Sequence, residues 1–356
     1  MFMALSVCAL FVIRRKFLHA IALGVISFAP LALYGIISIM QGSYFLPNSL
    51  ILKSSTSNIT SLSDLFITSV VTGYHELLAS GPLFVLVVLS LLLIAALYFQ
   101  SRQLWTPTIL LLSIFVSSSM LHLILASAGA YSSFRYDAYL LVLGLVVVTY
   151  GFTRLIDQTD QQRVVLSPFA RYALIASLGL ILLTPPFYRR GWVILADTSE
   201  ATNNIYQQQF QMADFLSEYY MGRSVAANDI GLISYQADIR LLDLWGLASM
   251  QVAQAKRAGE YNTELIAKLA QEHNVEIALV YTSWYEPYGG LPKTWEKVGS
   301  WTVSHNLVLG DNTVTFYAVD KAEAQELCDN LTAFAGQLPA GVEATVGLVS
   351  EGTLSP

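Results

Sequence analysis

Long apolar stretches in the first half of the chain limit what this sequence can fold into. A helix that crosses a bilayer needs about 20 apolar residues, because no water is present there to bind its backbone. Five stretches come close to this length: Phe17–Met40, Gly81–Gln100, Thr106–Ala126, Ala138–Phe152 with its flanks, and Tyr172–Tyr188. The opening run Met1–Ile13 is apolar but shorter. The sequence therefore predicts an α-helical transmembrane bundle of about six spans over residues 1–190.

The charged residues divide the chain into two parts of different character. Residues 1–190 hold 11 Lys and Arg against 5 Asp and Glu, whereas the rest hold 8 against 20. Overall, 54% of the residues are hydrophobic and 12% are charged, which is about half the charged fraction of an ordinary soluble domain. The two parts therefore suit different environments. The acidic second part argues against nucleic acid as a partner, since that role needs a basic face.

Basic residues in the bundle favour one side of the membrane. Seven of the eleven lie in connections that share a side: Arg14, Arg15, Lys16, Arg102, Arg154, Arg163 and Arg171. Lysine and arginine concentrate on the cytoplasmic side of membrane proteins. This predicts a multi-pass protein of the cytoplasmic (inner) membrane, with the loop 41–80 and everything after residue 188 outside the cytoplasm. The exceptions to the rule are Lys53, Arg135, Arg189 and Arg190.

The predicted outer loop 41–80 is long for a connection in a bundle, and long loops commonly carry function. Its second part starts with capping residues at Ser61, and apolar residues then recur at helical spacing through Leu65, Val70 and Tyr74. This pattern predicts an amphipathic helix. Two interpretations stay open: the helix lies on the outer membrane face, or it packs on the bundle without a ligand.

Strand and helix signals alternate in the second part of the chain. Strands are expected over Arg223–Asn228, Arg240–Leu244, Glu276–Thr282, and as an antiparallel pair over Trp295–Ser304 and Asn312–Val319. Helices are expected over Ser199–Met221, Thr263–His273 and Lys321–Phe334. The alternation predicts a small extracytoplasmic α/β domain of two or three layers over residues 191–337. Residues 338–356 are expected to form a flexible tail, because Gly, Pro, Ser and Glu are frequent there.

Familiar catalytic and metal-binding patterns are absent from the sequence. It has no phosphate-binding glycine loop, dinucleotide fingerprint, nucleophile elbow or HExxH zinc motif. The five histidines form no ligand pattern, and the two cysteines, Cys8 and Cys328, have no metal-ligand spacing. We therefore predict no metal site from these residues, while a requirement for a divalent metal stays open.

Two cations stand at the outer boundary of the bundle, where the charge rule disfavours them. Lys53 follows the second span, and Arg135 precedes the fifth. Both residue types bind phosphate through charge-assisted hydrogen bonds, so the phosphate of a membrane lipid is one explanation. The alternative is that Arg135 pairs with Asp137 or Glu76 and that Lys53 only reaches toward the headgroups. The candidate substrate-binding residues on this side are Lys53, Arg135, Asn48, Tyr136 and His75.

Two acidic residues stand at the ends of predicted strands in the α/β domain. Asp229 follows the first strand and enters a turn at Gly231, and Asp243 ends the second strand shortly before Gly246. Sheets of this class bind ligands at the carboxyl ends of their strands, so Asp229 and Asp243 are candidate substrate-binding residues. The alternative is structural: Asp229 caps a helix over Gly231–Tyr235, and Asp243 fixes the turn at Gly246.

These runs resemble the signature of a known superfamily. The stretch Asn228-Asp229-Ile-Gly231, continued by Asp243-Leu-Trp-Gly246, looks like the extracytoplasmic domain of bacterial GT-C-type membrane glycosyltransferases. The run Leu46-Pro47-Asn48-Ser49-x3-Lys53 is similar to one in their arabinofuranosyltransferase-like and mannosyltransferase-like branches. The resemblance touches both parts of the chain and says little about the substrate.

The resemblance implies a transferase that takes a sugar from a polyprenyl phosphate and passes it to a glycan or protein acceptor on the outer face. Such enzymes invert the anomeric carbon, and an acid in their first external loop is the general base. The loop 41–80 is similar to a later loop of the family, and Asp64 and Glu76 are its acidic candidates. The resemblance therefore implies the C-terminal part of a longer enzyme.

A second hypothesis is a non-catalytic membrane protein whose outer domain binds a glycan or a partner protein. A transporter fits the sequence less well. Transporters commonly carry polar or broken spans and internal repeats, whereas the apolar stretches here are mostly plain aliphatic.

Overall fold

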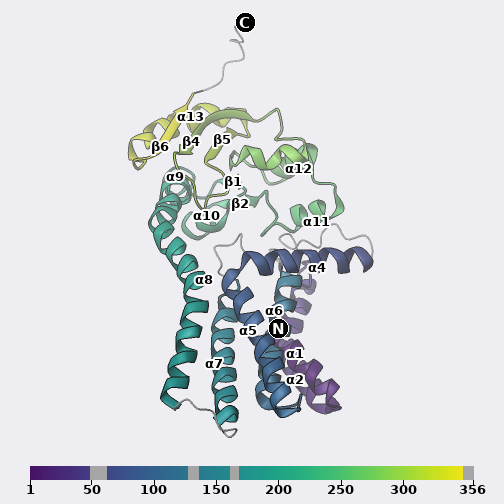
Figure 1. Ribbon diagram of the computed structural model, residues 1–356. Helices are drawn as coiled ribbons and strands as arrows, with labels where there is room; N and C mark the ends of the chain where they lie inside the picture. The colour runs from purple at the N-terminus through teal and green to yellow at the C-terminus, as the bar shows by residue number, and fades with distance from the viewer. Residues whose placement is uncertain (49–61, 127–135, 161–167, 348–356) are drawn as a thin grey trace. The chain divides into compact units, whose positions relative to one another are not determined.

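The computed structural model describes residues 1–48, 62–126, 136–160 and 168–347 (Figure 1). The chain forms two compact units, Met1–Ile194 and Leu195–Pro356, and the division falls within helix α8 (Pro168–Ile205). The first unit is helical, and the second contains a six-stranded sheet.

Apolar helices make up the described part of the first unit. Their bounds are α1 (Phe2–Ile13), α2 (Phe17–Met40), α4 (Leu62–Ala79), α5 (Gly81–Ser101), α6 (Pro107–Ala126), α7 (Ala138–Asp160) and the first part of α8. Local residues set the ends of α5. Pro82 lies in its first turn, where a proline removes no hydrogen bond, and Arg102 ends it in the left-handed conformation.

Four helices in the described ranges are long and apolar enough to cross a membrane. These are Phe17–Met40, Gly81–Ser101, Pro107–Ile124 and Ala138–Asp157. Helix α1 has only 12 residues, and α8, which holds the expected stretch Tyr172–Tyr188, is not among the four. The structure therefore confirms an apolar helical first half compatible with a multi-pass membrane protein. It does not confirm the expected six spans.

Exposed aliphatic side chains on α2 fit a lipid environment. Leu18 is 81% exposed and Ile26 is 73% exposed, and only 11% of the apolar window in this helix is buried inside the unit. Leaving so much apolar surface in water is unfavourable by about 25 cal/mol per Å². Lipid tails remove this cost, which accounts for a helix that is apolar on every side.

Helices α5, α6 and α7 pack around a common core. Leu86, Leu112 and Phe115 are fully buried there. Gly144 of α7 permits the close approach of α6, because a Cβ atom at this position would lie 2.6 Å from the Phe115 ring. Small residues at helix interfaces serve this purpose in membrane bundles.

Two basic connections meet at one end of this bundle. The Arg14 guanidinium, between α1 and α2, donates to the Trp105 carbonyl at 2.9 Å and lies 4.9 Å from the centroid of that ring. Trp105 itself lies between α5 and α6. The α1–α2 and α5–α6 connections therefore share a side, as the distribution of charge predicts.

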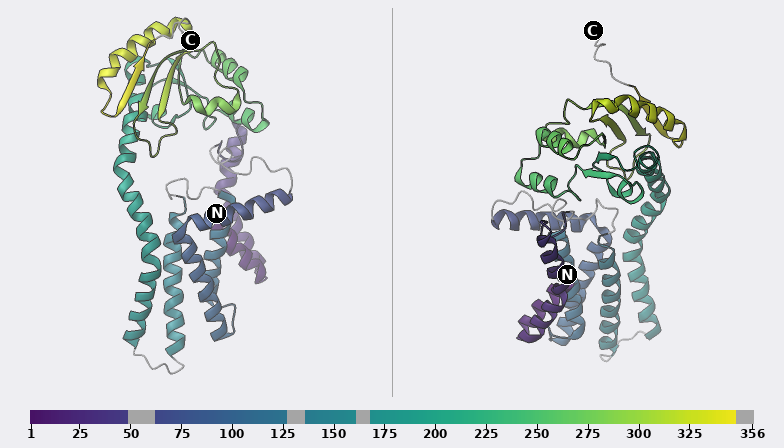
Figure 2. Two further views of the ribbon diagram at one scale, coloured as in Figure 1. Left: turned by 45° about the horizontal axis from the view of Figure 1, so that its top comes forward. Right: turned by 180° about the vertical axis from the view of Figure 1, so that it is seen from behind.

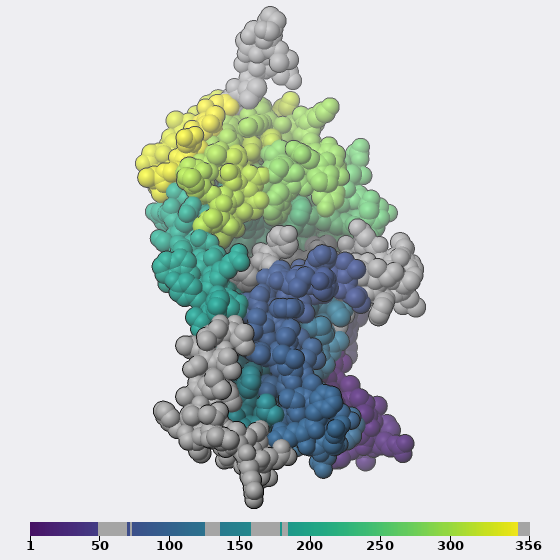
Figure 3. All heavy atoms as spheres, in the orientation of Figure 1, coloured from purple at the N-terminus to yellow at the C-terminus, as the bar shows by residue number. Residues whose placement is uncertain are grey.

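Helix α4 confirms the helix expected in the second part of the loop 41–80. It packs against α5 and α6, and in Figure 3 the dark-blue atoms of α4 and α5 adjoin. Leu77 is half-buried in the core of these helices. On its other side Val70, Tyr74 and Leu78 are 46%, 60% and 46% exposed. The helix is thus packed on the bundle and also keeps an exposed apolar stripe, and its contact with a membrane surface stays a prediction.

The second unit is built on one mixed sheet (Figure 2). Its strands lie in the order β2-β1-β3-β5-β4-β6. The strands are β1 (Ser224–Ala227), β2 (Arg240–Asp243), β3 (Ile277–Val280), β4 (Glu296–Val303), β5 (Thr313–Ala318) and β6 (Val342–Val346). Strands β2, β1 and β3 run parallel, and the remaining pairs are antiparallel. The five expected strands are confirmed.

Helices cover both faces of the sheet, so the unit has three layers. Along β1, Val225 and Ala227 enter one core and Ala226 enters the other, as the two-residue period of a strand requires. The first core includes residues of α9 (Gln211–Tyr219), α10 (Gly231–Gln236) and α13 (Ala324–Phe334). The second includes residues of α11 (Met250–Ala258) and α12 (Thr263–Glu272).

The expected flexible tail 338–356 is wrong for residues 342–346, which form strand β6 at the edge of the sheet beside β4. Val342 and Val346 pack partly against the core. The three side chains between them are exposed, so this stretch joins the sheet mainly through its backbone hydrogen bonds to β4. A strand with so little buried surface is hard to read from composition. Residues 348–356 lie outside the described ranges.

We expect Gly144→Ala to destabilise the helical unit by about 1–3 kcal/mol, because the added methyl group overlaps the Phe115 ring. Thermal unfolding of the detergent-solubilised chain measures the change. The matched control is Gly24→Ala in α2, where no atom lies within 4 Å of the new Cβ. Equal melting temperatures for the two variants would contradict the packing.

Candidate functional site

The carboxyl ends of the three parallel strands gather the polar residues of the α/β unit. Asn228 and Asp229 follow β1, Asp243 ends β2, and Tyr281 follows β3. Strands β2 and β3 lie on opposite sides of β1, so the order in which strands are added to the sheet reverses between β1 and β3. Ligands bind open α/β sheets outside the carboxyl ends of the strands at such a reversal point. We refer to this region as the carboxyl edge.

Asn228 bridges the two strands at the reversal point. Its side-chain Oδ1 accepts a hydrogen bond from the Tyr281 backbone N–H at 3.0 Å. The residue is 2% exposed, and its Nδ2 has no partner within the described part of the chain. A buried amide without a partner costs about 1–3 kcal/mol, which marks this position as polar and locally unsatisfied.

Asp229 joins a hydrogen-bonded group instead of capping a helix. Its Oδ2 accepts from Gln209 Nε2 and lies 3.0 Å from the Tyr281 hydroxyl. The Tyr281 hydroxyl also lies 2.7 Å from Gln208 Oε1. The expected cap is wrong, because α10 begins after Ile230 and receives no side-chain hydrogen bond there. A π-helical turn over Tyr206–Phe210 supplies both glutamines, and such turns are frequent at functional sites.

Tyr281 acts as a hydrogen-bond donor in this group. Burial raises the pKa of its hydroxyl, and the neighbouring Asp229 carboxylate raises it further. The proton therefore stays on the phenol oxygen at neutral pH. This residue holds a position and does not accept a proton.

Asp243 builds the loop that follows β2. Its two oxygens accept hydrogen bonds from four backbone N–H groups, of Trp245 (2.7 Å), Gly246 (3.1 Å), Ala248 (2.6 Å) and Ser249 (3.2 Å). Gly246 has φ +91°, and a Cβ atom there would lie 3.0 Å from the Ala253 nitrogen. The structure therefore agrees with the turn-forming alternative for Asp243. Its carboxylate has little capacity left for a ligand.

Aromatic rings continue the carboxyl edge beyond Tyr281. The centroid of Trp284 lies 5.2 Å from that of Tyr281 and 4.4 Å from that of Trp245. Trp284 and Tyr288 belong to a 3-10 helix over Thr282–Tyr288 that directly follows β3. Neither residue was predicted as part of a site, although the three aromatic residues that follow this buried strand within Thr282–Tyr288 were a usable signal.

Lys256 of α11 points its ammonium into these rings. Its Nζ lies 3.1 Å from the centroid of Trp245, 5.0 Å from that of Tyr261 and 5.1 Å from that of Tyr288. Burial lowers the pKa of Lys256 to about 7, against the opposing attraction of Asp243. A lysine with such a pKa beside the carboxyl edge is a candidate for a functional role, because perturbed groups concentrate at functional sites.

A second polar group lies in the helical unit, at the end of α5 away from Trp105. Asp137, just before α7, is 4% exposed and forms a two-pronged ion pair with Arg190, at 2.8 and 3.0 Å. Ser80 donates to the same carboxylate at 2.7 Å. Arg190 is one of the cations that depart from the charge rule, and this pairing supplies a reason for its place.

The other predicted residues belong to the first unit, outside the α/β unit that holds Asp229 and Asp243. Lys53 and Arg135 lie outside the described residues. Asn48 is 8% exposed, and Tyr136 lies just before α7. His75 is exposed on α4, with its ring centroid 5.8 Å from that of Tyr74. The catalytic candidates also belong to α4, where Glu76 is half-buried and Asp64 lies in the first turn.

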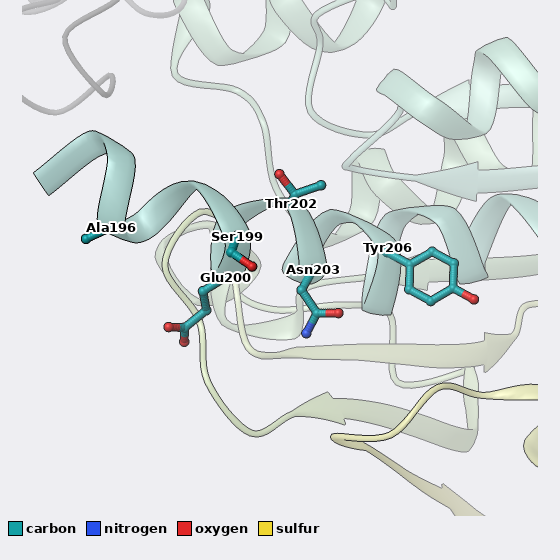
Figure 4. A pocket seen from close by; sticks show the side chains of 6 residues that line it. All are labelled: Ala196, Ser199, Glu200, Thr202, Asn203 and Tyr206. Carbon is teal, nitrogen blue, oxygen red and sulfur yellow. The ribbon is translucent and has the colours of Figure 1, made fainter. Parts of the chain in front are cut away.

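A shallow depression near the end of α8 is lined by residues of that helix and of the following turn (Figure 4). The lining side chains are Ala196, Ser199, Glu200, Thr202, Asn203 and Tyr206. Next to it, Asn204 and Gln207 use their amides to bind the backbone carbonyls of His305 and Ala340, at 2.6 and 2.8 Å. These amides hold the chain in place. Within the described ranges no cluster of His, Cys, Asp and Glu is suited to a metal ion.

Comparison with known proteins finds one family. A family model described as "Domain of unknown function (DUF8728)" matches residues 203–317, about a third of the chain. No curated protein and no solved structure matches the chain. The matched segment contains β1, β2, β3 and every residue of the carboxyl edge discussed above.

Lys256→Met tests the buried ammonium. Between a folded pKa of about 7 and the ordinary value of 10.5, the unfolded chain holds a proton that the native state has released. Wild-type stability attributable to Lys256 should therefore rise with pH across this range and be lowest below pH 7. The measured quantity is the free energy of unfolding of the variant minus that of the wild type. We expect this difference to be about 1–3 kcal/mol more favourable to the variant at pH 6.5 than at pH 9.5, after allowing for solvent screening.

Urea unfolding of the full chain at several pH values measures this difference. The control is Lys268→Met, because Lys268 is 68% exposed and pairs only with Glu272 at 3.7 Å. A pH dependence shared by both variants would show that Lys256 is not responsible.

The ion pair of the helical unit is tested by a double-mutant cycle. We expect Asp137→Ala to destabilise the chain by roughly 3–5 kcal/mol, because it leaves a largely buried guanidinium without this carboxylate. The double variant with Arg190→Ala should lose less than the sum of the single changes. The exposed pair Arg154–Asp157 is the control, and thermal unfolding in detergent is the measurement. Strict additivity at Asp137 and Arg190 would refute the coupling.

Proposed function

We propose that this chain is a membrane glycosyltransferase of the GT-C type, or the C-terminal part of one. It moves a sugar from a polyprenyl-phosphate donor to a glycan or protein acceptor on the outer face of the cytoplasmic membrane. One observation carries the proposal: the two runs that resemble this superfamily, at Asn228-Asp229 and at Asp243, end adjacent parallel strands. The two runs are separated in the sequence, but both lie at the carboxyl edge of the sheet, which accounts for their joint occurrence.

The proposed topology has six spans, formed by α1, α2, α5, α6, α7 and the first part of α8. The end that carries Arg14 and Trp105 faces the cytoplasm, as the concentration of basic residues favours. The end with Asp137 and Arg190 faces outward, where the ion pair offsets the cation. The α/β unit then lies outside the cytoplasm, where a hydrophilic acceptor is available.

The proposal assigns the donor to the outer end of the bundle. Lys53 and Arg135 bind the lipid phosphate by charge-assisted hydrogen bonds, with Asn48, Tyr136 and His75 around it. The general base of an inverting transfer is an acidic residue, as the resemblance implies. Asp64 and Glu76 on α4 are the candidates that this sequence offers.

The carboxyl edge holds the acceptor in this proposal. Asp243 is used by four backbone N–H groups, and Asp229 by Gln209 with Tyr281 alongside. Both carboxylates are therefore occupied by groups of the chain itself. They shape the edge against which the acceptor binds, and proton abstraction falls to another residue.

A second function is favoured by the same feature. If neither Asp64 nor Glu76 acts as a base, the chain is a non-catalytic membrane protein whose outer domain binds a glycan or a partner protein. The carboxyl edge serves as the binding surface in both functions. Transfer activity of the full chain distinguishes them.

Binding of undecaprenyl phosphate to the full chain in lipid nanodiscs tests the donor site. We expect Arg135→Ala to weaken this binding at least 5-fold, because one charge-assisted phosphate contact contributes about 1–3 kcal/mol. The matched control is Arg102→Ala, which removes a cation from the other end of α5. Equal affinities for wild type and Arg135→Ala, both well folded, would remove Arg135 from the donor site, and no binding by the wild type would refute the proposed donor.

A further inference from the structure

Helix α8 stays apolar beyond the stretch that is expected to span the membrane. Residues 191–196 read Gly-Trp-Val-Ile-Leu-Ala, and the first acid after them is Asp197. The four large side chains of this segment are each between 40% and 70% exposed: Trp192, Val193, Ile194 and Leu195. We call residues 191–196 the α8 collar.

The exposed side chains of the collar point to every side of the helix. Successive residues of an α-helix are turned by about 100°, so four in a row cover most of its circumference. A partner protein covers one face of a helix, which then carries a stripe of apolar residues. Exposure all round is typical of a helix surrounded by lipid, because water makes apolar surface unfavourable by about 25 cal/mol per Å².

A series of contacts fixes the depth at which the collar begins. Arg190 pairs with Asp137, and Ser80, which directly precedes α5, donates to the same carboxylate. Helix α5 has 21 residues. At 1.5 Å per residue it rises about 32 Å, which matches the hydrocarbon thickness of about 30 Å. In a bilayer that α5 crosses, Arg190 therefore lies where the hydrocarbon ends and the headgroups begin.

The length of the collar matches the headgroup layer. Six helical residues rise about 9 Å. A bilayer is about 40–45 Å thick with its headgroups, which leaves about 5–8 Å on each side of the hydrocarbon. Trp192 stacks on Tyr188 with ring centroids 5.9 Å apart, and these residue types concentrate at membrane–water interfaces. The polar run Asp197-Thr198-Ser199-Glu200 follows where water begins.

Helix α4 offers a second apolar surface at the same depth. It ends at Ala79, next to Ser80, and runs across the ends of α5 and α6 (Figure 1). A Cβ atom on Gly73 would lie 3.0 Å from the Ile124 side chain near the end of α6, so one face of α4 rests on the bundle. Its exposed apolar side chains recur every four residues, at Val70, Tyr74 and Leu78. Such a stripe is typical of a helix that lies in a membrane surface.

Arg189 supplies a charge that suits this layer. It is exposed, and residues 185–196 contain no acid. An arginine among headgroups binds lipid phosphate through charge-assisted hydrogen bonds. A phosphate contact gives a reason for a cation that departs from the charge rule, as the Asp137 carboxylate does for Arg190.

We propose that the α8 collar and the exposed stripe of α4 lie in the headgroup layer of one leaflet, in contact with phospholipid, and that Arg189 binds lipid phosphate there. The Asp137–Arg190 pair then lies at the inner edge of this layer, where charges must be paired. The proposal is independent of sugar transfer and of which leaflet is the outer one.

Photo-cross-linking of the full chain tests the contact. Leu195 is replaced by p-benzoylphenylalanine, and the chain is reconstituted in vesicles of equal phosphatidylcholine and phosphatidylglycerol. Adducts formed on irradiation are identified by mass spectrometry. The control position is Asn203, which is exposed on the same helix. We expect at least 5-fold more lipid adduct at Leu195, because Asn203 lies about 12 Å farther along α8, in water.

The same replacement at Tyr74 tests the stripe of α4, where we expect a lipid yield close to that at Leu195. A yield at Leu195 no higher than at Asn203, or a protein adduct there in place of lipid, overturns the contact of the collar. A yield at Tyr74 no higher than at Asn203 overturns the contact of α4.

The lipid composition of the adducts tests Arg189. At Leu195 we expect phosphatidylglycerol to exceed phosphatidylcholine about 5-fold, because one cation at the surface favours anionic lipid by that factor. The excess should fall toward equality in Arg189→Gln. Arg102→Gln, at the other end of α5, is the matched control and should keep the excess. The same lipid ratio in wild type and Arg189→Gln removes Arg189 from the phosphate contact.

Discussion

Four backbone N–H groups converge on the carboxylate of Asp243, and the carboxyl edge of the α/β unit depends on this interaction. The carboxylate fixes the loop after β2, and this loop carries Trp245. Trp245 in turn contacts both Trp284 and Lys256. This acid therefore works through the backbone, and its removal would release Trp245 from its place beside the lysine.

In the helical unit a buried ion pair has a comparable role. Asp137 and Arg190 connect the start of α7 with α8, and Ser80 adds the start of α5. Charges with so little exposure are costly unless they are paired and hydrogen-bonded. The pairing therefore fixes how the starts of α5 and α7 meet α8, at the end of the bundle opposite the Arg14–Trp105 contact.

Local patterns in the sequence predicted much of the fold. Alternation and buried runs located β1 to β5, and apolar length located four helices that can cross a membrane. The turn at Asp243 could also be anticipated, because an acid shortly before Gly246 is a local signal. The features that were not predicted depend on residues far away in the sequence. Strand β6 is stabilised by its pairing with β4, and Gln209 reaches Asp229 from a π-helical turn. The rings around Lys256, those of Trp245, Tyr261 and Tyr288, come from three segments, so no short window of the sequence contains them.

In the proposed orientation the α/β unit lies outside the cytoplasm, and the labelling of a single cysteine at the carboxyl edge tests this most directly. Ser283→Cys, in a chain whose Cys8 and Cys328 are replaced by serine, puts a thiol at an exposed position beside Trp284. We predict that a membrane-impermeant maleimide labels it in intact spheroplasts as fully as after lysis. Labelling that appears only after lysis would put the unit in the cytoplasm and contradict the proposed orientation.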